Sequence, residues 1–369
     1  MASITRRSRR SAWLVRYRDP TGRVRNSSFR RRVDAERFAN SVETELAHGT
    51  WTDPDRGKIK VADWARVWLR SKVDLRASSR TRLDSIVRTH VLPEFGDYAL
   101  NRVGNSDVRA WVASMIASGY SPATVRKSFH ALSQMMRAAV SDRRITFNPC
   151  LDVPLPAERQ EEQRFLSAEE VEHLAASIDD RFRTLVLLAA YGGLRFGELG
   201  GLRRSRVDLL RGRVIVAETL VEVDGALTFG APKTKQSRRG VPLPRPIVTE
   251  LEHHLAEYVA PAPDALVFTG PKGGCLRRTG FSRSWWRPAL ERAGLGTLKF
   301  HELRHTFVAL WVAAGAHPKE ISIRAGHSSV AFTLDRYGHL YQDAEFEVPD
   351  RLAALLASRP ARHTRAKSG

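Results

Sequence analysis

The stretch KFHELRHTFVALWVAAG, residues 299–315, predicts an amphipathic helix that carries chemically active side chains at its amino end. His301 and Arg304 lie one turn apart at the start of this helix, where free backbone N–H groups favour anions. Gly315 is a typical helix stop. The side of the helix that would face a core consists of apolar residues at helical spacing, Leu303, Phe307, Leu310 and Ala314.

The same stretch leaves two chemistries open. His301, Glu302 and His305 match the His-Glu-x-x-His pattern of zinc proteases, in which two imidazoles hold the metal and the carboxylate activates water. A zinc site needs a third ligand, and Glu320, the nearest candidate, follows a glycine-histidine-proline break. The His-x-x-Arg pair can instead hold a phosphate group. His305 is then a buried histidine or a supporting group, and Glu302 is an acid at the start of the helix.

The composition favours a polyanionic partner. The chain has 369 residues, a hydrophobic fraction of 42% and a formal net charge of +20, which together indicate several folded domains and a nucleic-acid ligand. Arginine dominates the basic residues, and its planar fork suits phosphate, although a GC-rich genome would also enrich arginine. No apolar run is long enough for a signal peptide or a membrane span. We therefore expect a cytoplasmic protein without membrane contact.

Cysteine usage agrees with that compartment. Cys150 and Cys275 are the two cysteines of the chain, and no Cys-x-x-Cys pair exists. This pattern favours neither a thiolate zinc site nor a disulfide framework.

Residues 1–55 predict a small module of two or three strands and one helix. Residues 1–40 hold twelve arginines and three acidic residues. AWLVRYRD, from residue 12, has the alternation of a strand, and Pro-Thr-Gly then indicates a turn. RVRNSSFRRR, from residue 23, predicts a second strand with arginine on its outer face, and Ala35 to Leu46 have helical spacing. Aromatic residues among the arginines favour a folded DNA-binding module over a solvated arm.

Residues 60–148 predict four helices. Segments around 60–73, 78–96, 105–119 and 121–142 each show an apolar face, with serine or asparagine before the later three and a proline stop at Pro93. Basic side chains stay on the polar faces of these helices. Residues 149–163 hold three of the prolines followed by a charged run, which indicates a linker.

A third domain is expected over residues 164–345. Ser167 and Glu170 form a capping box at its first helix. YGGLRFGEL places Arg195 after a Gly-Gly turn, with Glu198 three residues on as a brace. APKTKQSRRGVPLP predicts a hairpin with Lys233 and Lys235 on its turn. A lysine there could protonate a departing oxygen.

Two further groups follow near the end of this domain. In IRAGHSSVAFTLDRYGHL, His327 ends one short helix, Ser328 or Ser329 caps the next, and Tyr337 lies on that second helix, ten residues after His327. Each motif alone has a plain structural explanation, such as a surface ion pair or a packed tyrosine. Their order in one basic chain is much more specific.

The set Arg195, Lys233, His301, Arg304, His327 and Tyr337 resembles the tyrosine recombinase family, that is, the phage integrases. GGLRFGEL, HELRHTF, GHSS and RYGH carry the resemblance, which covers the whole chain. It implies a multidomain α+β protein with an arm-type DNA-binding module at 1–55, a four-helix core-binding domain at 60–148 and a linker at 149–163. A mainly helical catalytic domain with a small β-sheet would occupy 164–345, and 346–369 would be a tail.

The resemblance also implies roles for these residues. Tyr337 would attack a DNA phosphate and form a 3′-phosphotyrosyl bond, so that strands can be rejoined without ATP, metal or other cofactor. Arg195 and Arg304 would grip the non-bridging oxygens. His301 would act in proton transfer around the tyrosine, and His327 would contact the phosphate. Lys233 is favoured as the acid for the leaving 5′-oxygen, Lys235 remains an alternative, and Glu198 is a supporting residue.

The implied partners are double-stranded DNA attachment sites and three further copies of the chain, as a homotetramer on DNA. A host DNA-bending protein and an excision factor are further expected partners. The basic first 55 residues favour DNA integration and excision of a phage or another mobile element over dimer resolution or topoisomerase activity. A DNA-binding protein that keeps the fold without catalysis would explain the charge, but not the complete set of reactive residues.

Overall fold

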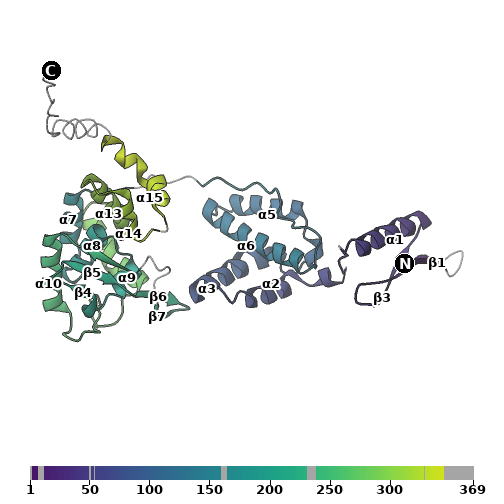
Figure 1. The fold of residues 1–369 in the computed structure, drawn as a ribbon, viewed down its shortest axis with the longest axis horizontal. Coiled ribbons are helices and arrows are strands. Elements are labelled where there is room, and N and C mark those ends of the chain that lie inside the picture. Colours follow the sequence, from purple (N-terminus) through teal and green to yellow (C-terminus); the bar gives the residue numbers. More distant parts are fainter. Residues whose placement is uncertain are drawn as a thin grey trace, which may run out of the picture. The chain divides into compact units, whose positions relative to one another are not determined.

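The computed structural model describes residues 2–6, 12–49, 51–53, 55–158, 164–230, 238–327 and 329–344. The chain divides into two compact units, residues 1–160 and residues 161–369 (Figure 1). The first unit therefore contains both the strand-rich segment and the helices of residues 60–148. Among the described residues, no helix has the length and apolar character needed to cross a membrane.

The first unit begins with a three-stranded antiparallel sheet covered on one face by α1. Val15 of β2 is buried and packs against Ala35 and Ala39 of α1, whereas the next residue, Arg16, is exposed. The turn after β2 is closed by Asp19, whose carboxylate accepts hydrogen bonds from the N–H groups of Thr21 and Arg23. The elements are β1 Ser3–Arg6, β2 Trp13–Arg18, β3 Val24–Phe29 and α1 Arg32–Ala47, with strand order β1-β2-β3.

The expected arginine-lined outer face of the second strand is wrong for Arg25. Arg25 pairs in register with Tyr17, which is buried against α1, and its guanidinium forms ion pairs with Asp19 and Asp53. The side chains alternate along a strand, so Arg25 shares the covered face with Tyr17. Arg6 of β1 and Arg16 and Arg18 of β2 are exposed basic side chains of the sheet.

The rest of the first unit is helical, as the periodicity predicts. Aromatic and aliphatic side chains pack together in its core. The Trp64 indole N–H on α2 donates a hydrogen bond to the Met135 carbonyl on α6 at 3.1 Å. Arg80, Arg82 and Lys127 remain exposed. The elements are η1 Arg56–Lys58, α2 Val61–Arg70, α3 Ala77–Ile86, η2 Val87–Val91, α4 Leu92–Phe95, η3 Leu100–Arg102, α5 Asn105–Ala117 and α6 Pro122–Ser141.

Local helix signals in this unit were partly wrong. Ser121 caps α6 as expected. However, α3 begins after Arg76, with no side-chain cap, and Gly104 precedes α5. Pro93 does not stop the helix either, because the chain continues from α3 through the π-helical turn η2 into α4. Pro93 lies in the first turn of α4, where a backbone N–H would have no partner within the helix, so proline loses no hydrogen bond there.

The second unit packs helices around the buried helix α8 and carries two small sheets (Figure 1). The Ser167–Glu170 capping box opens α7 as predicted. The helices as far as residue 258 are α7 Ala168–Ser177, α8 Asp180–Gly192, α9 Phe196–Gly200, η4 Arg204–Arg206 and α10 Arg245–Tyr258. The remaining helices are α11 Arg278–Phe281, η6 Ser282–Trp286, α12 Arg287–Arg292, α13 Glu302–Ala313, α14 Pro318–Ala325, α15 Val330–Tyr337 and η7 Gly338–Ala344.

The strand pairing differs from the expected hairpin around the lysines. Asp224 and Gly225, both with positive φ, close the hairpin between β6 and β7, while β8 pairs with β5 in the other sheet. The segment 231–237, which lies outside the described residues, therefore joins two different sheets. The strands are β4 Val207–Asp208, β5 Arg213–Val216, β6 Thr219–Val223, β7 Ala226–Gly230 and β8 Arg239–Pro242, in the orders β4-β5-β8 and β6-β7.

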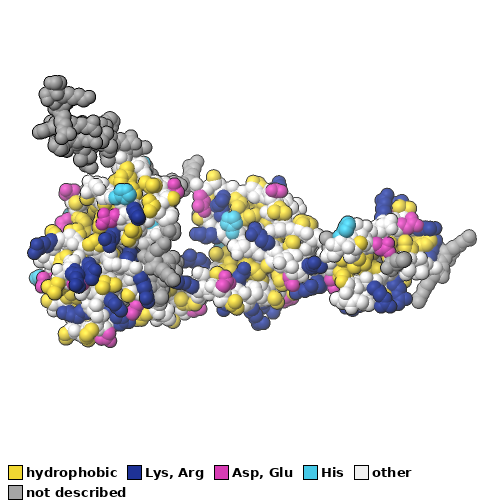
Figure 2. Space-filling view, viewed as in Figure 1, with side chains coloured by type: hydrophobic (Ala, Val, Ile, Leu, Met, Phe, Trp, Pro, Cys, Tyr) yellow, Lys and Arg dark blue, Asp and Glu magenta, His cyan; other side chains and the backbone are white. Residues whose placement is uncertain are grey.

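The amphipathic helix predicted within residues 299–315 forms as α13, Glu302–Ala313. Leu303 and Phe307 are buried, whereas Leu310 is half-buried and Ala314 is exposed, so the apolar stripe covers only the first turns. Gly326 ends α14 in a left-handed conformation, and Ser329 caps α15 by accepting from the N–H of Phe332. Lysine and arginine side chains are spread over the visible face of each unit (Figure 2).

Candidate active site

Arg195 is presented by the sharp turn between α8 and α9. Gly193 ends α8 with φ +64°, and a Cβ atom there would lie 2.6 Å from the ring of Phe307. Glycine is therefore required both by the left-handed backbone and by the close approach of α13. The turn leaves the Arg195 guanidinium partly exposed, donating to Glu198 Oε1 at 2.9 Å and to the carbonyl of Gly326 at 3.3 Å.

Glu198 is a buried brace shared by two arginines. Its carboxylate accepts a hydrogen bond from the Arg195 backbone N–H at 2.9 Å, in addition to the guanidinium contact. Arg239, also buried, donates to both oxygens of the same carboxylate. Burial alone would raise the pKa of Glu198, but hydrogen bonds and charge from Arg239, with the charge of Arg195, hold it below its usual value. The carboxylate is thus ionised and fixes Arg195 in place.

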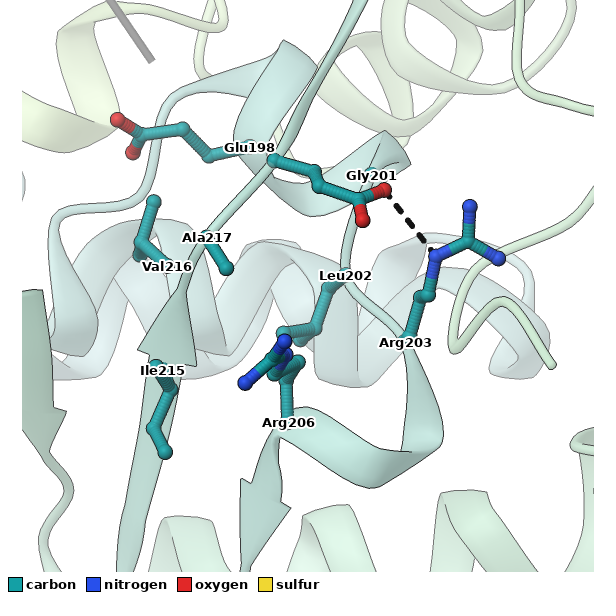
Figure 3. Close-up of a pocket in the computed structure, with 9 residues that line it drawn as sticks. Glu198, Gly201, Leu202, Arg203, Arg206, Ile215, Val216 and Ala217 are labelled. Carbon is teal, nitrogen blue, oxygen red and sulfur yellow. Dashed lines mark hydrogen bonds and ion pairs between the residues drawn. The ribbon is translucent and has the colours of Figure 1, made fainter. Parts of the chain in front are cut away.

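A small pocket lies behind this brace, between α9 and β5 (Figure 3). In that view Glu198 points away from Arg203, which instead pairs with Glu218 at 3.1 Å. The Glu198 carboxylate pairs with Arg195 and Arg239. The Arg203–Glu218 ion pair is separate from this group.

Arg304 is held in the interior of the second unit by backbone carbonyls. Its guanidinium donates to the carbonyl of Gly193 at 2.5 Å and to that of Ala325. Burial, then the charge of Arg195, lowers the pKa of Arg304 to about 9, which still leaves it cationic at neutral pH. Three guanidinium groups, those of Arg195, Arg239 and Arg304, thus accompany the one carboxylate of Glu198. This surplus of positive charge suits a phosphodiester.

Tyr337 completes the site from the last turn of α15. Its side chain is almost fully buried. Its hydroxyl lies 2.5 Å from His305 Nδ1 on α13. The His327 ring stacks on the tyrosine ring, with centroids 6.2 Å apart and planes at 5°, and His327 Nδ1 is hydrogen-bonded to Thr333. Burial raises the pKa of Tyr337, while the charges of Arg336 and Arg304 oppose the rise.

His301 lies on the open side of this group. Together with Arg195 and Arg278 it lines a cavity of about 620 Å³, which extends along the β6–β7 hairpin. Its ring meets that of His305 edge-on, with centroids 5.4 Å apart. The imidazole in contact with the Tyr337 hydroxyl is that of His305, whereas the family resemblance implies that His301 acts in proton transfer around the tyrosine.

The three histidines are neutral at physiological pH. Burial first, and then neighbouring positive charges, lower the pKa of His301 to about 4, that of His305 to about 4 and that of His327 to about 3. Neutral imidazoles can accept protons. The positive charges that add to the effect of burial would also attract a DNA phosphate.

Two predicted residues cannot be placed. Lys233 and Lys235 lie outside the described residues. For the zinc alternative, the Glu302 carboxylate accepts a hydrogen bond from the Lys299 N–H at 2.9 Å, as an acid at the start of a helix does. Over the part of the chain that the structure describes, no three His, Cys, Asp or Glu side chains gather as potential metal ligands.

Sequence reasoning missed Arg239 and undervalued His305. Arg239 stands among other basic residues in QSRRG, with no spacing signal that links it to Glu198, 41 positions earlier. The sequence indicates for His305 a zinc ligand, a buried histidine or a supporting group, and no direct contact with the tyrosine. Its position directly after Arg304 gave no sign of contact with Tyr337.

Comparison with known proteins identifies the family of the chain. The profile described as "Phage integrase family" matches residues 164–343, and the profile "Phage integrase, N-terminal SAM-like domain" matches residues 60–116. The chain belongs to the phage integrase family of tyrosine recombinases. It is a site-specific recombinase by family membership.

Individual relatives match most of the chain. A putative prophage phiRv2 integrase of Mycobacterium tuberculosis is 27% identical, over 93% of this chain and 92% of the relative. The Tn1549 transposon integrase, solved with a circular intermediate DNA, is similar in fold with a TM-score of 0.68 at 21% identity, covering 80% of this chain and 99% of that one. A lambda integrase tetramer bound to a Holliday junction has a TM-score of 0.57 at 19% identity, covering 87% and 92%.

Proposed function

We propose that this protein integrates and excises a phage or another mobile element by cleaving and rejoining DNA through a 3′-phosphotyrosyl intermediate. The observation that carries the proposal is the convergence of Tyr337 with Arg195, Arg304 and His327. Tyr337 lies on α15, Arg304 on α13, Arg195 in the turn before α9, and His327 in the turn between α14 and α15. Arg195 donates to the carbonyl of Gly326, next to His327, whose ring stacks on Tyr337. The charge of Arg304 also acts on the tyrosine. This largely buried, cationic arrangement supports a nucleophile that acts beside two guanidinium groups.

The two arginines stabilise the charge that grows on the non-bridging phosphate oxygens in the transition state. Glu198 and the carbonyls of Gly193, Ala325 and Gly326 hold their guanidinium groups before substrate arrives. Such preorganised donors contribute about 3–4 kcal/mol each in well-studied hydrolases. The Tyr337 oxygen forms a bond to phosphorus as the bond to the 5′-oxygen breaks, and a lysine of the 231–237 segment, Lys233 in preference to Lys235, supplies the proton to the leaving oxygen.

The domain roles follow from the same proposal. Residues 1–55 would bind arm-type sites, 60–148 would bind the core site, and 164–345 would carry out catalysis. Residues 149–163 would link these two parts. Exposed Arg16 and Arg18 on the open face of the sheet, and exposed Arg80, Arg82 and Lys127 on the helices, provide phosphate contacts.

The proposed partners are double-stranded attachment sites and three further copies of the chain on DNA. A host DNA-bending protein and an excision factor would set the direction of the reaction. The protein would work in the bacterial cytoplasm. The lambda integrase tetramer on a Holliday junction supports the tetramer by analogy of fold.

Covalent trapping tests the proposal. The protein is incubated with a nicked duplex that carries the attachment site, taken from DNA flanking its gene, and the mixture is denatured and separated on a gel. We expect an adduct that maps to Tyr337, is absent from Tyr337→Phe and persists in EDTA. Tight, specific binding without any adduct would instead favour a DNA-binding protein without catalysis, and loss of the adduct in EDTA would favour a metal enzyme.

A further inference from the structure

His305 makes a contact that none of the expected catalytic roles explains. It lies on α13, one turn beyond His301, and its Nδ1 is 2.5 Å from the Tyr337 hydroxyl on α15. The two residues are 32 positions apart in the chain. The contact therefore depends on the packing of two helices and not on local sequence.

We propose that His305 is the general base that takes the proton of Tyr337 when the tyrosine attacks DNA, and the acid that returns it when the strand is rejoined. The inference rests on the proposed function. It assigns the proton transfer to a residue outside the expected set, which placed that role on His301.

The geometry separates His305 from the other two histidines. His327 presents its ring face to Tyr337, and its Nδ1 is already bonded to Thr333 at 2.9 Å. His301 meets the ring of His305 and lines the open cavity. A base must reach the proton within about 2.6–3.2 Å or through one water. His305 satisfies that condition before DNA is bound.

The surroundings keep His305 neutral until DNA binds. Burial, followed by His301, Arg336 and Arg304, lowers its pKa to about 4. Arg304 belongs to α13, and His301 is the residue immediately before that helix. Arg336 and Tyr337 belong to α15, and His327 lies in the turn before α15. An incoming phosphate would offset part of the positive charge and so favour the protonated imidazole as the reaction proceeds.

The step balances without an added reagent. His305, with its own proton on Nε2, accepts the tyrosine proton at Nδ1 as the bond from the tyrosine oxygen to phosphorus forms. The bond from phosphorus to the 5′-oxygen breaks, and the lysine acid protonates that oxygen. Rejoining reverses each transfer, so that the His305 imidazolium protonates the departing tyrosine oxygen.

Single-turnover cleavage of the nicked duplex tests the role of His305. His305→Ala removes the base and leaves space beside Tyr337, whereas His305→Asn keeps a hydrogen-bond acceptor that cannot take up a proton. We expect both variants to cleave about 10²–10⁴-fold more slowly, since that is the usual contribution of a general base. His253→Asn, an exposed histidine on α10, is the matched control and should cleave at the normal rate. Melting curves and DNA-binding titrations verify that each variant folds and binds.

Two further readouts distinguish a base from a packing residue. Added imidazole should restore part of the cleavage rate of His305→Ala, with a rate that rises with the basicity of substituted imidazoles. A 5′-bridging phosphorothiolate, whose sulfur leaves without a proton, should not restore either variant. Restoration by the sulfur substrate would make His305 the acid for the leaving group, and normal rates in His305→Asn would make it only a positioning residue.

Each of those results overturns the proposal, as does the absence of imidazole rescue in a folded, DNA-binding His305→Ala. Failure of the proposed function would give a different result, because the unaltered protein would then form no covalent adduct with DNA.

Discussion

Arg239 donates a hydrogen bond to each oxygen of the Glu198 carboxylate, at 3.1 and 3.0 Å, and both side chains are almost completely buried. Arg239 also donates to the carbonyl of Arg324 at 2.5 Å. The Arg239 guanidinium therefore connects β8 to Glu198 of α9 and to the end of α14. Because β8 follows directly on the 231–237 segment, the same residue anchors the chain beyond the candidate lysines.

Loss of Arg239 should destabilise the second unit. Arg239→Met leaves Glu198 buried with Arg195 as its remaining guanidinium partner, and breaking a buried pair costs about 3–5 kcal/mol. Urea unfolding measures the change in free energy. Arg203→Met is the control, because its partner Glu218 is partly exposed and such pairs contribute about 0–1 kcal/mol. Equal losses in the two variants would contradict a structural role for the buried pair.

Replacement of Arg304 by lysine should impair catalysis more than binding. Lysine keeps the charge but cannot bridge the Gly193 and Ala325 carbonyls and still face the phosphate. We expect Arg304→Lys to reduce the single-turnover cleavage rate about 10²–10³-fold, the usual loss for one transition-state donor.

Arg292→Lys controls for the loss of a guanidinium that binds a carbonyl, because exposed Arg292 donates twice to Ser177 at the surface. Its cleavage rate should stay normal. A rate for Arg304→Lys within a factor of two of the unaltered protein would exclude transition-state stabilisation by the guanidinium.

Stability should fall as the pH is lowered from about 7 to about 5. The pKa values of His301 and His327 are about 4 and about 3 in the folded protein, whereas an unfolded histidine has a pKa of about 6.5. The unfolded chain therefore binds protons first, so acid favours unfolding.

Thermal melts across this range should show a smaller pH dependence for His327→Asn than for the unaltered protein. The exposed residue His253 serves as the control, and His253→Asn should retain the full slope. An unchanged slope in His327→Asn would mean that this histidine titrates normally in the folded state.

A substrate whose leaving group needs no proton can show which lysine is the general acid. We expect Lys233→Ala to lose about 10²–10⁴-fold in cleavage, a typical contribution of a general acid, and to recover on a 5′-bridging phosphorothiolate. Lys235→Ala should lose less and gain nothing from the sulfur. The opposite pattern would assign the role to Lys235.

Deletion of 346–369 should weaken assembly. These residues lie outside the described part of the chain, but Val348, Leu352, Leu355 and Leu356 have the spacing of a docking helix. We expect the truncated protein to bind a single core site normally and to form fewer tetramers on DNA, measured by analytical ultracentrifugation. Equal assembly of the two forms would rule out a docking role for the tail.

The sequence by itself determined the reactive groups and much of the local structure. The Ser167–Glu170 capping box and the helices α1, α6 and α13 follow from spacings of three and four residues, which the chain displays directly. A serine cap before Tyr337 was also evident, but the structure decided for Ser329 over Ser328. Gly193 was visible as part of a Gly-Gly turn before Arg195. The order of the motifs sufficed to indicate the family.

Only the tertiary structure decided which groups touch. Arg239 and Glu198 are 41 residues apart, and His305 and Tyr337 are 32 apart, so no local periodicity relates them. The register of β3 against β2 places Arg25 opposite Tyr17, on the covered face of the sheet. The pairing of β8 with β5 puts β8 in a different sheet from β7. Helix and turn preferences act over a few residues, whereas these contacts depend on how the helices and strands pack. The assignment of His305 to Tyr337 follows from that packing alone.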